Sequence, residues 1–498
     1  MKYVAWIVVL AFWGSAAMSN ERARPPYVPD NQINTARVNV LAAADAERVG
    51  EFAMRFPVGH LKSEVIDWKS PDQALTWTVN VAADGDYLIS AILEQNSGPQ
   101  LNLSVNAADN IVIAPFVQDP RGFASRSDFG KSIHLKAGHQ SITVRIVPAL
   151  SANDAFSVEF LALELVTRDT KDTMSQKALA MRADGRWLAR ERFGVMTHWT
   201  KRTMPRKGPQ LNYTDAVNAF DVDQYANQIA STGASFVVFT TSHSDQYFPA
   251  PIAALDKILP GRTTRRDLIG ELIAAFKKRD MNFFLYYHIG PIEDPAWGTA
   301  SGLWETDSTQ LFNNWRAIIG EVGLRYGKKL DGWWFDDGAY NYMYRSPDWQ
   351  SLDVAAKAGN AARLVCFNSW SSTSATDFQD YHCGEELTPN HGINVRLNHD
   401  GSFNGTLTKG GDGRITKGAF KGLQAVSTFV LESDWLHTKR DTEAAEPKIS
   451  PIVLADTLDK IKAHAGTPII NMLVYQDGVI PAKSLETVRM ANDLLGNN

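Results

Sequence analysis

An apolar and aromatic run, residues 330–335, stops at two carboxylates and a glycine, Asp336, Asp337 and Gly338. A run of this length that ends at a turn signal is typical of a buried parallel strand. Because side chains alternate along a strand, Trp334 and Asp336 lie on one face, where a carboxylate beside an indole could hold and attack a sugar. The alternative is that Asp336 or Asp337 only caps the helix that follows.

Similar polar and aromatic residues stand at the ends of the other expected strands. In parallel barrels the active site lies at the carboxyl ends of the strands, so these residues would surround one pocket. Aromatic rings pack on the C–H face of a sugar, imidazoles bind its hydroxyls, and two carboxylates can break a glycosidic bond. The strand-end residues are, in chain order, His198 and Trp199, His243 and Asp245, Tyr286, Tyr287 and His288, Trp334 and Asp336, Asn368 and Trp370, Glu385 and Glu386, and Glu432, Asp434 and Trp435.

The elements that would position these residues alternate between strand and helix from residue 181 onward. Short apolar runs separated by amphipathic helices, such as 223–232 and 311–326, are typical of a parallel α/β barrel. The eight expected strands are 193–198, 235–241, 282–287, 330–336, 363–368, 380–385, 427–432 and 467–473. We therefore predict an α/β fold with a (β/α)8 TIM-like barrel over residues 181–498, which ends in one helix near 484–495.

The region before the barrel has a different pattern. Short runs of alternating apolar and polar residues, such as 75–81, are separated by clusters of Gly, Asn and Asp. This spacing is typical of an all-β sandwich, which we place at residues 26–166 and expect to be jelly-roll-like. The turn patterns at 83–87 and 135–142 resemble those of carbohydrate-binding jelly rolls, so the sandwich either binds sugar or is purely structural. A polar linker is expected over 167–180.

The first 19 residues have the three regions of a secretory signal peptide. Lys2 is followed by an apolar run at 4–13 and by small residues, Ala17 and Ser19, that offer cleavage sites. The apolar run is too short to cross a bilayer. We therefore expect an exported protein, periplasmic or extracellular, with no membrane partner after cleavage of residues 1–19.

Charge and cysteine content narrow the class of protein. The 498 residues carry a formal net charge of -5, which gives no basic footprint for nucleic acid, so the partner is expected to be neutral or small. The two cysteines, Cys366 and Cys383, fall in expected neighbouring strands. We expect two buried free thiols, and a bridge between them is the geometric alternative.

Other catalytic chemistries lack their motifs. The chain has no His-Glu-x-x-His or comparable ligand cluster, and no Gly-x-Ser-x-Gly elbow for a serine nucleophile. The glycine-rich stretch 401–422 lacks the Gly-Lys-Ser/Thr of a phosphate loop, so we interpret it as a long loop over the mouth of the barrel. We expect no metal site and no cofactor.

Most of residues 187–482 resemble the α-L-fucosidases of glycoside hydrolase family 29. The segment Arg192–Trp199 resembles the first strand of the family, Lys-Phe-Gly-Ile-Phe-Ile-His-Trp-Gly, and Ser235–Asp245 resembles the second, which ends Lys-His-His-Asp. Trp334-Phe335-Asp336 is similar to the nucleophile strand. The further similar segments are Arg266–Leu272, Phe284–Tyr287, Asp380–Glu385, which resembles the Asp-Tyr-x-Thr-Pro-Glu acid/base segment, and Asn471 with Asp477–Pro481.

Several positions depart from the family pattern. The second histidine of the pair is Ser244, the glycine after its aspartate is Gln246, and the glycine after His-Trp is Thr200. The pocket-shaping Glu-Trp-Tyr segment is missing, and Ser369-Trp370 replaces an arginine. The β-sandwich that follows the barrel in many members is not expected here. These departures suggest a changed sugar or linkage more than a lost activity.

The resemblance implies a retaining exo-glycosidase that acts on a fucose-containing glycan. Asp336 would be the nucleophile and Glu385 the acid/base, with Glu386 and Glu432 as alternatives. The substrate-binding residues would be His198, Trp199, His243, Tyr286, Trp334 and Trp435. Two other functions remain open: hydrolysis of another L-sugar or of internal linkages in a fucan, and carbohydrate binding on a barrel without catalysis.

Overall fold

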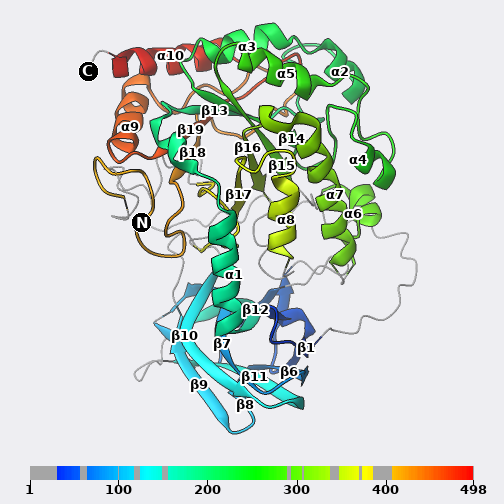
Figure 1. Ribbon diagram of the computed structural model, residues 1–498, viewed down its shortest axis with the longest axis vertical. Helices are drawn as coiled ribbons and strands as arrows, with labels where there is room; N and C mark the ends of the chain where they lie inside the picture. The colour runs from blue at the N-terminus through cyan, green and yellow to red at the C-terminus, as the bar shows by residue number, and fades with distance from the viewer. Residues whose placement is uncertain are drawn as a thin grey trace.

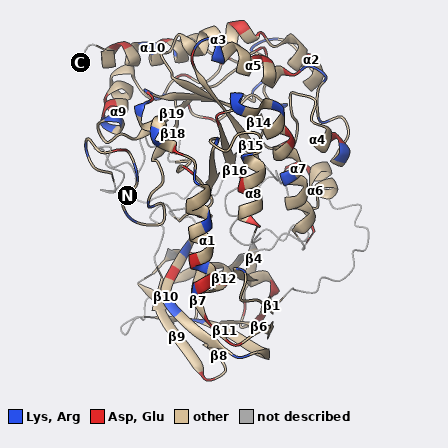
Figure 2. Cartoon of the chain, in the orientation of Figure 1, with Lys and Arg blue, Asp and Glu red and all other residues tan. Residues whose placement is uncertain are grey.

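The computed structural model describes residues 31–55, 64–98, 100–116, 124–148, 155–288, 293–305, 308–336, 347–369, 373–384 and 407–496. Two groups of elements follow one another along the chain, strands with one short 3-10 helix (Ala43–Asp45) up to residue 167 and mixed helices and strands after it (Figure 1). Basic and acidic residues are spread over both groups (Figure 2). The expected signal peptide at 1–19 lies outside the described residues.

The first group forms two β-sheets. One has the order β1-β6-β11-β8-β9 with β3 paired to β6, and the other has the order β10-β7-β12-β5-β4 with β2 paired to β12. The strands of the first sheet are β1 (Gln32–Ile33), β3 (Glu47–Val49), β6 (Ala74–Val81), β8 (Leu101–Ala107), β9 (Asn110–Pro115) and β11 (Gly138–Pro148). Those of the second are β2 (Asn39–Ala42), β4 (Ala53–Arg55), β5 (Glu64–Trp68), β7 (Gly85–Ser97), β10 (Ser125–Leu135) and β12 (Ser157–Thr167).

The two sheets enclose one hydrophobic core, as their alternating pattern predicts. Along β6 the apolar side chains Leu75, Trp77, Val79 and Val81 are buried. Trp77 reaches across to Phe160 of the other sheet, with ring centroids 6.4 Å apart. Inward apolar residues at every second position let each sheet cover the other, which is the packing of a sandwich.

The segment expected as a linker, 167–180, is helical. Helix α1 (Arg168–Met181) begins where β12 ends, and the Thr167 side chain caps it by accepting a hydrogen bond from the Thr170 amide. Thr167 also donates to the carbonyl of Thr35 at 3.2 Å. The helix leads from the sheets to the mixed group (Figure 1).

The mixed group is built on a parallel sheet of seven strands, in the order β17-β16-β15-β14-β13-β19-β18. They are β13 (Gly194–Thr197), β14 (Phe236–Ser242), β15 (Asn282–His288), β16 (Gly332–Asp336), β17 (Leu364–Asn368), β18 (Val426–Val430) and β19 (Thr467–Asn471). Seven of the eight expected strands are therefore confirmed, as a parallel half-barrel.

The sixth expected strand, 380–385, is not a strand in its described part. Asp380 donates its amide to Val365 at the start of β17, and Gly384 accepts from Thr428 of β18. Tyr381 forms a single parallel bridge with Gln424. The segment thus lies between the two edge strands, and the described residues do not form a complete eight-stranded barrel.

Helices cover the outer face of the parallel sheet (Figure 1). Outward residues such as Phe239, Leu285 and Phe335 share one core with them, whereas Val238, Phe284 and Trp334 belong to a separate inner core. The helices are α2 (Tyr213–Ala219), α3 (Val222–Ala230), α4 (Ala253–Ile258), α5 (Leu268–Lys277), α6 (Pro295–Ser301), α7 (Thr309–Tyr326), α8 (Trp349–Ala356), α9 (Pro451–Ala463) and α10 (Ala482–Gly496). None of the described helices combines the length and the apolar character that a membrane crossing requires.

Cys366 and Cys383 form a disulfide, with Cα atoms 5.5 Å apart. The expectation of two buried free thiols is therefore wrong. Cys366 points inward from β17, and the segment 380–384 runs alongside that strand, which brings the two sulfur atoms together. The bridge ties this segment to the sheet one residue before its described part ends.

Candidate active site

Asp336 is the last residue of β16 and is 8% exposed. One carboxylate oxygen accepts a hydrogen bond from the Tyr286 hydroxyl at 2.6 Å, and the other accepts from the Asn368 side-chain amide at 2.9 Å. The register explains this set, because His288, Asp336 and Asn368 are paired across β15, β16 and β17 at the last position of each strand. Two neutral donors therefore orient a buried carboxylate at the carboxyl end of the sheet.

His198 follows β13 and faces the same end of the sheet. Its Nδ1 lies 2.9 Å from Oδ1 of Asn471, and the Asn471 amide nitrogen donates to the carbonyl of Trp435 at 3.0 Å. Because the amide oxygen of Asn471 can only accept, Nδ1 carries the proton and Nε2 is the acceptor in the neutral ring. Burial lowers the pKa of His198 to about 4, against the opposing effects of the Asn471 hydrogen bond and the Asp336 charge.

His243 lies directly after β14, with its ring centroid 5.3 Å from that of His198 and 6.1 Å from that of Tyr286. Burial lowers its pKa well below the ordinary value, and His198, His288 and Arg202 add to this effect. Its Nδ1 is 2.9 Å from Oγ of Ser244. Both imidazoles are therefore neutral near pH 7, which suits hydrogen bonding to hydroxyl groups.

Ser244, one of the departures from the family pattern, has a φ of 61°. This left-handed conformation is uncommon for a residue with a side chain and turns the backbone sharply after His243. The next residue, Asp245, is paired with Arg202 at 2.5 Å, and Arg202 also donates to the Ser244 carbonyl. The turn is thus fastened to the loop after β13.

The predicted aromatic residues occupy two depths. Tyr286 stacks on Trp334 with ring centroids 5.1 Å apart, and the Trp334 indole donates to the Cys383 carbonyl at 3.2 Å. Trp334 and Tyr286 are both 1% exposed, so this stacked pair lies within the inner core. Trp435 is partly buried, with its ring 5.3 Å from that of His198, and it is the indole of this group that keeps an accessible surface.

Trp199 does not join the group, and we correct its assignment as a substrate-binding residue. Its side chain is 1% exposed in the outer core, where it contacts the rings of Tyr213, Phe220 and Phe239. The physical reason is the alternation along the extended chain, which sends His198 inward and Trp199 outward.

Glu385 and Glu386, expected as acid/base residues, lie outside the described residues, as does Trp370. Glu432 is described and is fully buried. Its carboxylate accepts from the Ser484 hydroxyl of α10 and from the Leu473 amide, and burial raises its pKa to about 8. Because it faces α10 on the outer side of the sheet, Glu432 is not a candidate acid/base.

Asn368, His288 and Asn471 complete the site, although none of the three is among the residues predicted to bind substrate; Asn368 and His288 were expected only as strand-end residues around the pocket. The register adds that His288 and Asn368 end neighbouring strands level with Asp336, which assigns them to its immediate surroundings. Among the residues that the structure describes, no group of three or more His, Cys, Asp or Glu side chains could hold a metal ion.

The chain matches the model of one protein family, described as alpha-L-fucosidase, over residues 208–493. The tissue alpha-L-fucosidase of Bos taurus is 26% identical over 247 residues, which are 41% of this chain and 50% of the bovine protein. The tissue alpha-L-fucosidase of Mus musculus is 27% identical over 138 residues, 21% of this chain and 30% of that protein. The chain thus spans half or less of the length of these curated relatives.

A solved structure, alpha-L-fucosidase isoenzyme 1 from Paenibacillus thiaminolyticus, is similar at 20% identity and a TM-score of 0.45, and the match covers 61% of this chain and 73% of that one. The family match includes Asp336 and six of the seven parallel strands in full, and begins after β13. Since it extends over more than half of the 498 residues, the chain belongs to the alpha-L-fucosidase family.

Proposed function

We propose that the chain is a retaining exo-glycosidase that releases α-L-fucose, or a closely related α-L-sugar, from oligosaccharides or polysaccharides. The observation that carries the proposal is the buried carboxylate of Asp336, held by Tyr286 and Asn368 at the carboxyl end of a parallel strand. The two fucosidase relatives support fucose as the sugar.

In this mechanism Asp336 attacks the anomeric carbon and forms a glycosyl-enzyme, while the bond to the leaving oxygen breaks. Glu385 gives its proton to that oxygen and then takes a proton from the water that releases the sugar. Glu386 is the alternative acid/base. A retaining mechanism needs the two carboxyl groups about 5 to 5.5 Å apart.

The other groups would hold the sugar. Nε2 of His198, an acceptor in the neutral ring, can receive a hydrogen bond from a sugar hydroxyl, and His243 lies near enough to bind a neighbouring one. The partly exposed ring of Trp435 offers an apolar face for the C–H side of the sugar. Fully buried Trp334 and Tyr286 would support Asp336 from below.

Two proposals concern the chain as a whole. Residues 26–166 would form the sandwich unit and 181–498 an eight-stranded barrel, in which the segment 380–385 closes the gap between β17 and β18. Two backbone hydrogen bonds support this closure: the Asp380 amide donates to β17, and the Thr428 amide donates to the Gly384 carbonyl. Export is supported by the Cys366–Cys383 disulfide, because such bridges persist in oxidising compartments.

The test is hydrolysis of an aryl α-L-fucoside, with an aryl α-L-galactoside alongside, by wild type, Asp336→Asn and Asp331→Asn. Asp331 precedes the same strand at its opposite end and accepts hydrogen bonds from Lys277 and the Phe283 amide, so it is a matched control. We expect Asp336→Asn to lower kcat by about a thousand-fold or more, which corresponds to about 4 kcal/mol. Asp331→Asn should stay within a few-fold of wild type.

Azide provides a second readout. In Asp336→Gly the space of the carboxylate is open, so azide should restore release of the aryl alcohol and give a glycosyl azide of inverted configuration. Activity of Asp336→Asn within ten-fold of wild type would contradict the nucleophile assignment. If wild type turns over neither aryl glycoside, release of sugar from fucose-containing polysaccharides distinguishes a hydrolase of internal linkages from a protein that only binds carbohydrate.

A further inference from the structure

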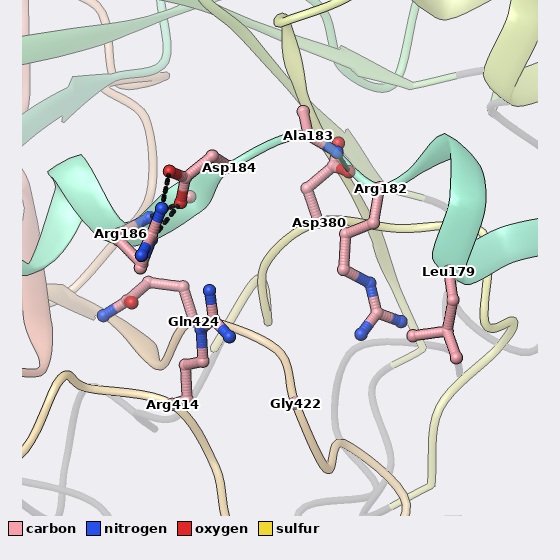
Figure 3. Close-up of a pocket in the computed structure, with 10 residues that line it drawn as sticks. Leu179, Arg182, Ala183, Asp184, Arg186, Asp380, Arg414, Gly422 and Gln424 are labelled. Carbon is pink, nitrogen blue, oxygen red and sulfur yellow. Dashed lines mark hydrogen bonds and ion pairs between the residues drawn. The ribbon is translucent and has the colours of Figure 1, made fainter.

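A cavity of about 400 Å³ lies at the end of the parallel sheet opposite to Asp336. It is lined by residues of α1 and the turn after it, by Asp380, and by the segment 414–424 (Figure 3). Asp380 is bonded to Val365 at the start of β17, and Gln424 precedes β18, so the cavity opens at the amino ends of the strands. Its size is within the range of small-molecule sites, about 300 to 1,000 Å³.

Three guanidinium groups line this cavity, those of Arg182, Arg186 and Arg414 (Figure 3). Arg186 is neutralised by two hydrogen bonds to Asp184, at 2.8 and 2.6 Å. Arg182 instead donates to two backbone carbonyls, of Gln379 and Asp377, both at 3.2 Å. Among the described residues Arg414 pairs with exposed Asp412, at 3.7 Å, which is beyond hydrogen-bond distance.

The one buried carboxylate of the cavity is already occupied. Asp380, 2% exposed, accepts hydrogen bonds from the amides of Ala183 and Val365 and from Lys357 at 3.0 Å. Lys357 is the cation at hydrogen-bond distance of Asp380 among the described residues, and it is shared with buried Asp353, also at 3.0 Å. In the described part of the chain, Arg182 and Arg414 are left with no carboxylate at hydrogen-bond distance, and a guanidinium in this situation favours an oxyanion.

A second polar feature points to a ligand that carries hydroxyl groups as well. Gln424 is 2% exposed, and its side-chain nitrogen donates to the Ala465 carbonyl at 3.1 Å. Its amide oxygen is buried and accepts no hydrogen bond from the described residues. Such an acceptor is costly to leave unpaired, and an anion cannot donate to it, whereas a hydroxyl group can.

The backbone next to the arginines keeps the space open. Gly422 has a φ of +84°, and a β-carbon there would lie 3.2 Å from a terminal nitrogen of Arg182. A side chain at this position would crowd the guanidinium that faces the ligand. The glycine thus serves both the turn and the cavity.

We propose that this cavity is a second carbohydrate site, which binds an acidic sugar, a uronate or a sugar sulfate ester. Arg182 and Arg414 hold the oxyanion, and the Gln424 amide oxygen accepts from a hydroxyl of the ring. The site is independent of the function proposed for Asp336, because it lies at the other end of the strands.

The test measures binding of glucuronate, galactose 6-sulfate, neutral galactose and inorganic sulfate to the full chain at constant ionic strength, by calorimetry. The proteins are wild type, Arg182→Gln, Arg414→Gln and Arg489→Gln. Arg489 lies on α10 and binds Ser231, so it is a matched loss of one guanidinium away from the cavity. We expect saturable binding of an acidic sugar, no binding of galactose, and a ten-fold or larger loss of affinity in both cavity variants but not in Arg489→Gln.

Binding that survives in Asp336→Asn supports a site separate from the candidate active site. Absence of saturable binding, or equal affinity in wild type and both cavity variants, overturns the proposal. Inorganic sulfate that binds as tightly as the acidic sugars overturns its carbohydrate part. Should Arg182→Gln fail to fold, Arg414→Glu decides the outcome. Arg414 is exposed, so this substitution reverses the charge of the side chain without removing buried atoms.

Discussion

Two buried carboxylates, Glu164 in the first part of the chain and Asp336 in the second, have different hydrogen-bond partners. In the sheets before α1, the buried carboxylate of Glu164 is neutralised by Arg126, with two hydrogen bonds at 2.6 and 3.0 Å. In the parallel sheet, Asp336 receives hydrogen bonds from neutral groups, and burial keeps His198 and His243 uncharged. The described hydrogen bonds thus join Glu164 to a cation and Asp336 to a hydroxyl group and an amide.

Arg126 also connects the two parts. Its backbone amide donates to the Thr373 hydroxyl at 3.0 Å, and its guanidinium donates to the Ser374 carbonyl at 2.5 Å. Both partners belong to the loop that follows β17, the strand that ends with Asn368. Arg126 of the first part therefore holds a loop next to the candidate site. Its charge is neutralised by Glu164, which also belongs to the first part.

The disulfide offers the largest difference between the two parts, because both cysteines of the chain lie in the second. The bridge spans 17 residues, and closing a loop of that length stabilises a protein by about 3 kcal/mol. We expect Cys366→Ala/Cys383→Ala to lower the melting temperature of the parallel-sheet part and to leave that of the first part unchanged. Calorimetry resolves the two transitions.

Reductant provides the control for that experiment. It should lower the same transition in wild type and have no effect on the double variant. Equal shifts of both transitions would contradict a disulfide that acts only on the second part.

Each part of the chain has a buried tyrosine whose hydroxyl group donates a hydrogen bond. The Tyr286 hydroxyl donates to Asp336 at 2.6 Å, and the Tyr87 hydroxyl donates to the Ala83 carbonyl at 3.3 Å. A hydrogen bond to a charged group contributes about 1.5 to 3 kcal/mol, so Tyr286→Phe should lower kcat/KM for an aryl α-L-fucoside by about 10- to 100-fold.

Tyr87→Phe is the matched substitution in the first part. It should leave kcat/KM unchanged and lower stability by about 1 kcal/mol or less. If both variants keep wild-type activity, the Tyr286 hydroxyl has no part in positioning Asp336.

The sequence predicted the repeating features of the fold well. Seven strands of the parallel sheet and the inward face of Asp336 follow from apolar runs and from strand alternation. The same rule separates His198 from Trp199, and assigning both to one pocket ignored it. The missing sixth strand depends on contacts of Asp380 and Gly384 with two distant strands, which no local pattern reveals.

The parts of the site that the sequence did not predict depend on register and on three-dimensional pairing. Asn368 contacts Asp336 because two strands end level with each other, and Asn471 orients His198 across 273 residues of sequence. The disulfide depends on the same three-dimensional pairing, and without it we expected two free thiols. Helix α1 did carry local signals, a Thr167 cap followed by residues with high helix propensity, which the polar composition concealed.

Glu432 is a buried carboxylate of the parallel-sheet part that the proposed reaction does not use, and its effect is on the pH dependence of stability. Burial raises its pKa from 4.5 to about 8, so between these values the folded state holds a proton that the unfolded state has lost. The contribution of Glu432 to stability is therefore complete below pH about 4.5 and falls by at most about 1.4 kcal/mol per pH unit as the pH rises to about 8. Glu432→Gln, which can still accept a hydrogen bond from Leu473 and bind Ser484, should not show this loss.

The measurement is the difference in melting temperature between wild type and Glu432→Gln at pH 5, 6, 7, 8 and 9, which should change steadily up to pH 8 and then level off. A difference that is constant over this range would mean that Glu432 is charged in the folded protein, and the contrast with the ion-paired Glu164 would then disappear.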